Sequence, residues 1–230
     1  MVLPGTRIDL FGENRLRTLK TFLFIALCMP AATLVFDLVS GALIEPVEEL
    51  TKTTGIWALR LLLVTLAITP IRKLTGWHKL IRFRRMLGVF SFTYMTLHFS
   101  IYLFLDRLLS GEEIFTDLTE RPYIIAGFTC FMLCVPLALT STDRMMRRLG
   151  GRHWQRLHRL VYPAAIAAAL HFIWLVKADI TEPIIYASIL ALLLGWRLRV
   201  FMIKSDRRSG TKRSNNGSGQ GSTPVMGQSS

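Results

Sequence analysis

Three of the five histidines lie in or beside long apolar segments, where a polar ring is costly and therefore indicates a function. His98 stands in an apolar segment at 86–105, and His171 stands in another at 158–176. A rise of 1.5 Å per residue puts them roughly 18 Å and roughly 20 Å from the basic ends of these segments. Neutral imidazole is a good iron ligand, so two rings at one depth on separate helices predict a six-coordinate haem. The alternative is a hydrogen-bonded polar pair that holds two helices together.

His158 lies at the basic end of the segment that contains His171, about 20 Å away along the helix. It could ligate a second haem, although the spacing places the two rings about 140° apart around an ideal helix. Pro163 lies between them and could reorient the rings. The segment with His98 has no histidine opposite His158, which leaves no second ligand, a weak ligand such as Met86, or a contact from Arg84. Arginine stays protonated and is a poor iron ligand, but it suits a haem propionate.

Arg60 is a charged residue inside another apolar segment, at 55–71. Its guanidinium could extend outward to the membrane interface or bind a haem propionate, and both interpretations stay open. Four aromatic residues fit either interfacial anchoring or packing on a porphyrin: Tyr94, Trp154, Tyr162 and Trp174.

Apolar residues make up 51% of the 230 residues, and several runs approach the roughly 20 residues that span a hydrocarbon core. This pattern predicts an all-α integral membrane protein. The expected fold is a six-transmembrane-helix bundle with spans at about 18–38, 55–71, 86–105, 123–141, 158–176 and 183–203. The spans form one haem-binding domain at 18–204, which follows a cytoplasmic segment at 1–17. Residues 205–230 are rich in Ser, Gly, Asn and basic residues, so we expect a disordered cytoplasmic tail.

Charge alternates between the connections of the predicted spans. The formal net charge is +13, and most of the 28 basic residues fall in the N-terminal segment, at 72–85, at 142–159 and in the tail. Most of the 15 acidic residues fall in the other connections. The positive-inside rule therefore predicts that the basic loops and both termini are cytoplasmic. This topology and contact with membrane lipids explain the positive charge without a nucleic-acid partner.

Several short motifs resemble the MsrQ (YedZ) family, which belongs to the wider ferric-reductase-like transmembrane group. They occur in order over roughly residues 50–200, and they are IRFRRMLG at 81–88, YMTLH at 94–98, RPY at 121–123, LTST at 139–142 and WQRLHRLVY at 154–162. No internal sequence repeat, phosphate-binding loop, dinucleotide-binding glycine motif or nucleophile motif is present.

The resemblance implies a haem-binding membrane subunit of a methionine sulfoxide reductase system in the bacterial inner membrane. The family's haem histidines fall on His98, His158 and His171, which implies one or two haem b groups. FMN is also ascribed to the family, but it cannot be placed on particular residues. Such proteins take electrons from the quinone pool or a cytoplasmic flavin reductase. They deliver them to a periplasmic molybdopterin-containing methionine sulfoxide reductase, which repairs oxidised envelope proteins, so the chain is an electron-transfer subunit rather than the catalytic one.

Two other functions stay open. One is a cytochrome b subunit of a different redox system, such as a ferric reductase or a dehydrogenase. The other is a membrane transporter or assembly scaffold in which the histidines are structural. No flavin and nicotinamide module follows the last predicted span, so we expect an external electron donor.

Overall fold

The computed structural model describes the backbone of residues 10–217 and the side chains of residues 14–203, and no strand occurs in this part of the chain. The α-helices are α1 Leu10–Val39, α2 Pro46–Thr75, α3 Ile81–Ile101, α4 Gly111–Glu120, α5 Pro122–Leu139, α6 Asp143–Leu149, α7 Gly151–Leu157, α8 Val161–Leu175 and α9 Thr181–Gly217. Three short helices adjoin them: the 3₁₀ helices η1 His78–Leu80 and η3 His158–Leu160, and the π-helix η2 Tyr102–Asp106.

Six helical segments of the described chain are long and apolar enough to cross a membrane. They are Asn14–Val39, Pro46–Thr75, His78–Asp106, Pro122–Leu139, Gly151–Leu175 and Thr181–Ile203. The predicted all-α, six-helix membrane protein is therefore confirmed. α2 begins at Pro46, well before the expected start of the second span at Gly55. α9 continues to Gly217, past the expected start of the tail at 205, and residues 218–230 of that tail lie outside the described residues.

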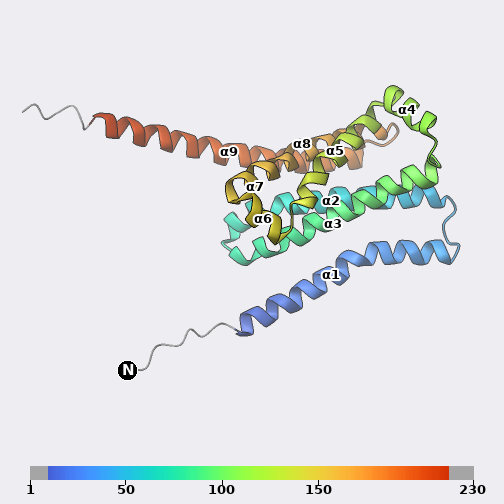
Figure 1. Cartoon of the computed structure of the whole chain (residues 1–230), viewed down its shortest axis with the longest axis horizontal. Coiled ribbons are helices and arrows are strands. Elements are labelled where there is room, and N and C mark those ends of the chain that lie inside the picture. The colour runs from blue at the N-terminus through green and yellow to red at the C-terminus, as the bar shows by residue number, and fades with distance from the viewer. Residues whose placement is uncertain (1–9, 218–230) are drawn as a thin grey trace, which may run out of the picture.

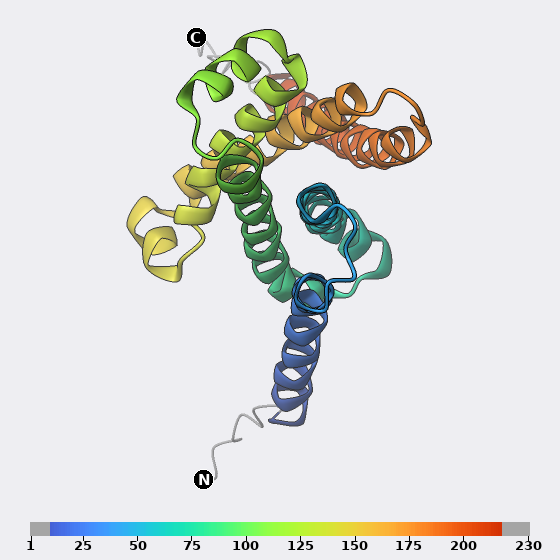
Figure 2. The same ribbon diagram turned by 90° about the vertical axis from the view of Figure 1, so that its right-hand side faces the viewer.

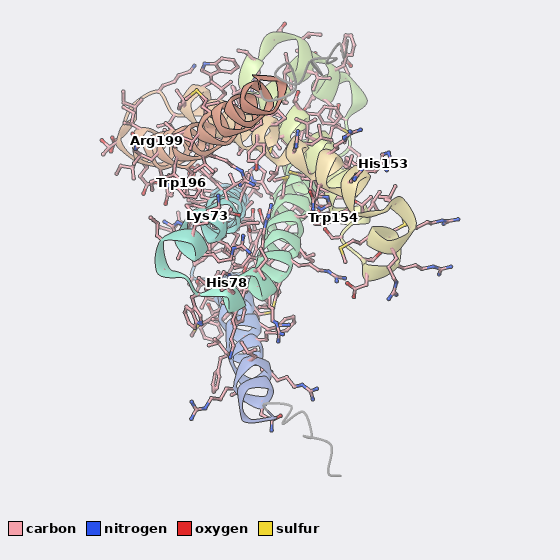
Figure 3. The ribbon with its side chains drawn as sticks, turned by 90° about the vertical axis from the view of Figure 1, so that its left-hand side faces the viewer. Lys73, His78, His153, Trp154, Trp196 and Arg199 are labelled. Atoms are coloured by element: carbon pink, nitrogen blue, oxygen red, sulfur yellow. The ribbon has the colours of Figure 1, made fainter. Side chains whose placement is uncertain are left out.

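The helices form antiparallel pairs, in which α2 packs along α3 and α5 packs along α8, with α9 beside α8 and α2 (Figure 1). The start of α1 and the end of α9 lie at the same end of the bundle (Figure 1). We call this end, which carries the loops at 72–85 and 142–159, the basic end, and the opposite one the acidic end. Figure 3 labels six residues toward the basic end, among them Lys73, whose ammonium lies 5.2 Å from the ring centre of Trp196.

The apolar core lies where α2, α8 and α9 meet. Leu59, Leu62 and Leu66 of α2 pack there against Val161, Ala165 and Ala169 of α8 and Leu190 of α9. Ala165 and its neighbour Ala164, which packs on Cys130 and Cys134 of α5, are completely buried. Small side chains let helix backbones approach closely, and this contact supplies much of the attraction between membrane helices. The alanine-rich run of α8 is therefore the surface on which the neighbouring helices are positioned.

α1 lies at the side of the bundle and bends part-way along its length; an end-on view shows it packed near the α2–α3 pair (Figures 1 and 2). Pro30 stands inside α1 and cannot donate to the preceding turn. The hydroxyl of Tyr94, on α3, accepts from the Ala31 amide at 3.2 Å and donates to the Leu27 carbonyl at 2.8 Å. These two backbone groups would bond to each other in an unbroken helix. Tyr94 therefore stabilises the bend of α1, and its side chain is buried between α1 and α3.

Replacing Tyr94 with phenylalanine should loosen α1. The variant keeps the buried ring but loses both hydrogen bonds to α1, so we expect a cost of about 1 kcal/mol in stability. Thermal unfolding of detergent-solubilised protein measures this. Tyr162→Phe is the matched control, because the ring of Tyr162 packs under Arg197 at 4.8 Å and its hydroxyl has no hydrogen bond among the described side chains. Equal stability of both variants would contradict this role of Tyr94.

A compact ionic network closes the acidic end beside α4. The carboxylate of Asp117 is buried and accepts from the Tyr102 hydroxyl at 2.9 Å. The Nε atoms of Arg107 and Arg121 lie 2.7 Å and 3.1 Å from its two oxygens. Burial acts to lower the pKa of Arg107, but the charges of Asp106 and Asp117 raise it on balance. The network fixes the connection between α3 and α5, and hence the entry of α5 into the bundle.

Candidate functional site

His98 of α3 and His171 of α8 come together toward the acidic end, with their ring centres 6.1 Å apart and their planes at 81°. They come from two different antiparallel pairs, α2–α3 and α5–α8. Both rings are half-buried in the bundle. The depth estimate from sequence therefore places the two residues where the structure brings them together.

Each of the two rings is tied to a main-chain carbonyl of the partner helix in its own pair. His98 Nδ1 lies 2.8 Å from the Thr51 carbonyl oxygen on α2, and His171 Nδ1 lies 2.7 Å from the Tyr123 carbonyl oxygen on α5. A carbonyl can only accept, so each Nδ1 carries the proton and donates it. Each neutral ring is then left with a lone pair at Nε2.

This tautomer makes a direct hydrogen bond between the two histidines impossible, because neither free nitrogen can donate. The two rings are therefore not hydrogen-bonded to each other, and each instead joins the two helices of its own pair. A neutral imidazole that donates through Nδ1 to a backbone carbonyl is also the usual form of a histidine that ligates a metal. With metal–nitrogen distances of about 2 Å, an iron between two imidazoles needs ring centres roughly 6 Å apart. The observed separation fits a haem iron held on both faces.

His158 is not part of this pair. It lies in η3 at the basic end, where its ring stacks on Trp154 with centres 3.8 Å apart. Its Nδ1 is 3.2 Å from the Trp154 carbonyl oxygen, so it has the same kind of backbone partner as the other two histidines. Trp154 is itself held by a 2.9 Å hydrogen bond from its indole nitrogen to the Thr140 carbonyl.

Arg84 of α3 acts electrostatically on His158. It also faces the positive charge of Arg197 on α9, and no carboxylate pairs with it within the described part of the chain. Met86 packs elsewhere, in the cluster of α1, α2 and α3 around Phe83 and Leu87. Of the groups expected near His158, Arg84 is therefore near enough to act on it electrostatically, and Met86 packs against the core cluster of α1, α2 and α3.

Arg60 points into the bundle. Its Nε donates to the Tyr186 hydroxyl of α9 at 2.8 Å, and its guanidinium carbon lies 5.3 Å from the ring centre of Trp57. None of the ion pairs among residues 14–203 includes Arg60. A cation in a membrane-spanning helix without a carboxylate partner fits the site of an anionic group.

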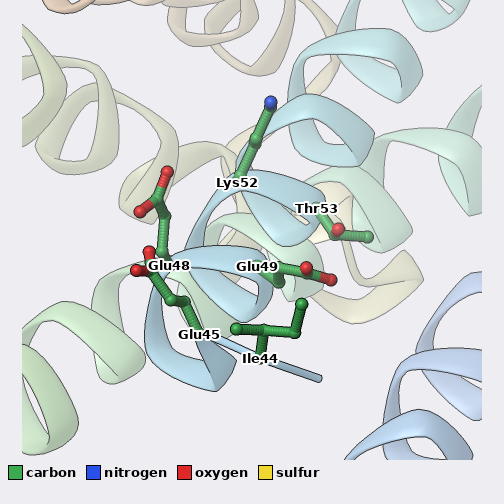
Figure 4. Close-up of a pocket in the computed structure, with 6 residues that line it drawn as sticks. All are labelled: Ile44, Glu45, Glu48, Glu49, Lys52 and Thr53. Atoms are coloured by element: carbon green, nitrogen blue, oxygen red, sulfur yellow. The ribbon is translucent and has the colours of Figure 1, made fainter. Parts of the chain in front are cut away.

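The start of α2, at the acidic end of the bundle, carries several carboxylates. A shallow pocket there is lined by Ile44, Glu45, Glu48, Glu49, Lys52 and Thr53 (Figure 4). A hydrogen bond with Glu48 and the charge of Glu48 raise the pKa of Glu45. Thr51, whose carbonyl anchors His98, lies in the same turns of α2. The acidic pocket and the carbonyl anchor of His98 are therefore positioned by one helix, α2.

Comparison with known proteins places the chain in a family. Residues 54–169 match the model for the ferric reductase like transmembrane component. The chain is 58% identical over 154 residues to the protein-methionine-sulfoxide reductase heme-binding subunit MsrQ of Xanthomonas campestris pv. campestris (strain B100), covering 67% of this chain and 70% of that protein. It is 54% identical over 170 residues to the subunit of the same name in Xanthomonas axonopodis pv. citri (strain 306), with coverages of 74% and 77%.

A relative from another genus gives the same result. The MsrQ subunit of Azospira oryzae is 47% identical over 187 residues, which cover 80% of each chain. No solved structure gives a significant match. The family model takes in His98 and His158 and ends just before His171. Identity at this level over two thirds or more of both chains shows that this protein belongs to the MsrQ family of ferric-reductase-like transmembrane proteins.

Proposed function

We propose that this protein is a membrane cytochrome b that holds haem between His98 and His171 and relays electrons to a methionine sulfoxide reductase. The observation that carries the proposal is the pair of rings 6.1 Å apart, each with Nδ1 tied to a carbonyl and Nε2 left as a lone pair. The names of the relatives, which describe a heme-binding subunit, support it.

The protein's own part in the relay is to position, bury and orient. A haem bound at this site supplies reversible one-electron transfer through its iron. Thr51 and Tyr123 hold the two imidazoles in the tautomer that ligates, and the surrounding helices keep the site away from bulk water. Arg60, which lacks a carboxylate partner, is suited to neutralise a propionate.

The basic end is the proposed entry point for electrons. Arg84 acts electrostatically on His158 there, and we infer that they hold a second haem, with His158 as ligand and Arg84 as the partner of a propionate. The donor is the quinone pool or a cytoplasmic flavin reductase, and FMN is a further cofactor of the relay, without an assigned site. Both termini are cytoplasmic, and the membrane is the bacterial inner membrane.

The acidic end is the proposed exit point. The acceptor is a periplasmic molybdopterin-containing subunit that reduces methionine sulfoxide in oxidised envelope proteins. Its reaction needs two electrons and two protons per sulfoxide and releases water, so the chain delivers two electrons in succession. The carboxylates at the start of α2 give this end a negative field that can orient a partner.

An absorption spectrum of the purified protein tests the haem first. Expression with sufficient haem should give Soret and α bands of low-spin, six-coordinate iron, and their absence would exclude the redox function and favour a transporter or scaffold. The dithionite-reduced protein should then be reoxidised faster when the cognate periplasmic reductase and a sulfoxide substrate are added together. If reoxidation is the same with and without the reductase, a cytochrome b of another redox system is the better assignment.

A further inference from the structure

We propose that Gly55 and Gly127 are the positioning residues of the two haem ligands, each providing the space in which one histidine ring is held. This inference rests on the proposed haem function and deepens it. It also explains why the rings can reach the backbone carbonyls at all.

The contacts at both glycines are unusually close. A Cβ atom on Gly55 would lie 3.0 Å from Cε1 and 3.0 Å from Nδ1 of His98. A Cβ atom on Gly127 would lie 2.8 Å from Nδ1, 3.0 Å from Cε1 and 3.3 Å from Cγ of His171. Ordinary contacts between carbon atoms are about 3.5–4.0 Å, so any side chain would overlap the ring. Each imidazole therefore lies directly against the backbone of the neighbouring helix.

The glycine and the carbonyl act together on one histidine ring. Gly55 follows Thr51 by four residues, and Gly127 follows Tyr123 by four residues, which is about one helical turn. Each glycine therefore lies on the same face of its helix as the residue whose carbonyl binds Nδ1. The missing side chain lets the ring approach the helix, and the carbonyl of the previous turn then fixes the ring's orientation. Both parts are needed for the short hydrogen bonds of 2.8 Å and 2.7 Å.

This arrangement of carbonyl, glycine and histidine occurs twice at nearly the same spacing. His98 follows its carbonyl residue by 47 positions, and His171 follows its own by 48. In both cases the first helix of an antiparallel pair gives the carbonyl and glycine, and the second gives the histidine. The two pairs, α2–α3 and α5–α8, thus present equivalent ligands to one site. The two helix pairs share only the glycine, the histidine and nearly the same spacing between them, so the sequence shows no repeat.

An alanine at either position should displace the ligand without unfolding the helix. The overlapping atoms belong to the end of a flexible histidine side chain, which can swing away. Alanine also favours a helix over glycine by about 1 kcal/mol, so local helix stability should not fall. The displaced ring loses its carbonyl partner, and changes of this kind typically weaken metal binding by about 10–100-fold. Gly127→Ala should have the larger effect, because its closest contact is shorter.

Two other helical glycines serve as matched controls. A Cβ on Gly88 would meet only Thr65 Cγ2, at 3.7 Å, and one on Gly195 would meet no atom within 4 Å. We expect Gly88→Ala and Gly195→Ala to keep the wild-type haem content and spectrum. Gly55→Ala and Gly127→Ala should lose about 10-fold or more in haem affinity, or convert the retained haem to a high-spin form. The measurements are haem per chain, the visible spectrum, and thermal unfolding of the haem-free protein.

The outcomes separate this inference from the function on which it rests. A wild-type protein without haem would remove both. Haem in the wild type and controls, with an identical spectrum and affinity in Gly55→Ala and Gly127→Ala, would overturn the inference alone. If Gly127→Ala does not fold, Gly55→Ala, with its milder contact, decides the question. A lower haem affinity in a variant whose haem-free form unfolds at the wild-type temperature identifies a positioning role rather than a structural one.

Discussion

Replacing His98 or His171 with alanine should remove the same low-spin haem signal in either case. The two rings share one site, so loss of one leaves iron with a single axial ligand and at least about tenfold weaker retention. We expect either no haem at this site or a five-coordinate, high-spin spectrum. Haem quantification per chain and the visible and paramagnetic resonance spectra measure the change.

His153 and His158 provide the comparison. His153→Ala changes an exposed residue of α7 at the basic end and should leave the spectrum unaltered (Figure 3). His158→Ala should remove only the second haem, because its ring stacks on Trp154 and lies outside the histidine pair. Retention of the low-spin signal in one of the two variants, His98→Ala or His171→Ala, would exclude the shared site.

Replacing Asp117 with alanine should be the most destabilising single change at the acidic end. The buried carboxylate binds two guanidinium groups and the Tyr102 hydroxyl, so its loss removes the closest anionic partner of both arginines and leaves Arg107 only the longer contacts to Asp106 and Glu113. The arginine side chains are 20% and 46% exposed, so solvent screens the pairs and we expect a cost of about 1–3 kcal/mol, as for the loss of hydrogen bonds to a charged group. We expect a marked drop in the unfolding temperature of the detergent-solubilised protein, together with faster proteolysis between α3 and α5.

The neighbouring carboxylates are suitable controls. Asp106 and Glu113 also lie near Arg107, but at 3.5 Å and 3.6 Å and with 43% and 57% of their side chains exposed. Exposed pairs of this kind contribute about 0.2–1 kcal/mol, so Asp106→Ala and Glu113→Ala should change stability little. A cost for Asp117→Ala that is no greater than theirs would show that burial of its carboxylate does not stabilise this connection.

The sequence predicted the helical membrane fold and placed His98 and His171 at one depth, because both follow from apolar run length and helical rise. It could not identify Thr51, since the expected second span began after it and a main-chain carbonyl leaves no mark in the sequence. The short helix α4 also escaped prediction. Its role depends on Asp117, whose burial comes from tertiary contacts with Arg107 and Arg121.

Contacts between distant helices explain the remaining differences. Arg60 had two open interpretations, and its hydrogen-bond partner in the structure, Tyr186, is 126 residues away on α9. Tyr94 looked like an interfacial or porphyrin-packing residue, yet its hydroxyl completes the backbone bonding of α1 beside Pro30. In each case the residue type was informative, while its partner was set by helix packing.

The backbone anchors have a consequence for mutational tolerance. The groups that orient the two ligands are the carbonyl oxygens at positions 51 and 123, which every amino acid possesses. The threonine hydroxyl and the tyrosine ring at these positions can therefore change without removing the anchor. Positions 55 and 127 should not tolerate such changes, because any residue other than glycine places a Cβ atom against the histidine ring. In a saturation library scored for haem content, positions 55 and 127 should therefore accept fewer replacements than positions 51 and 123.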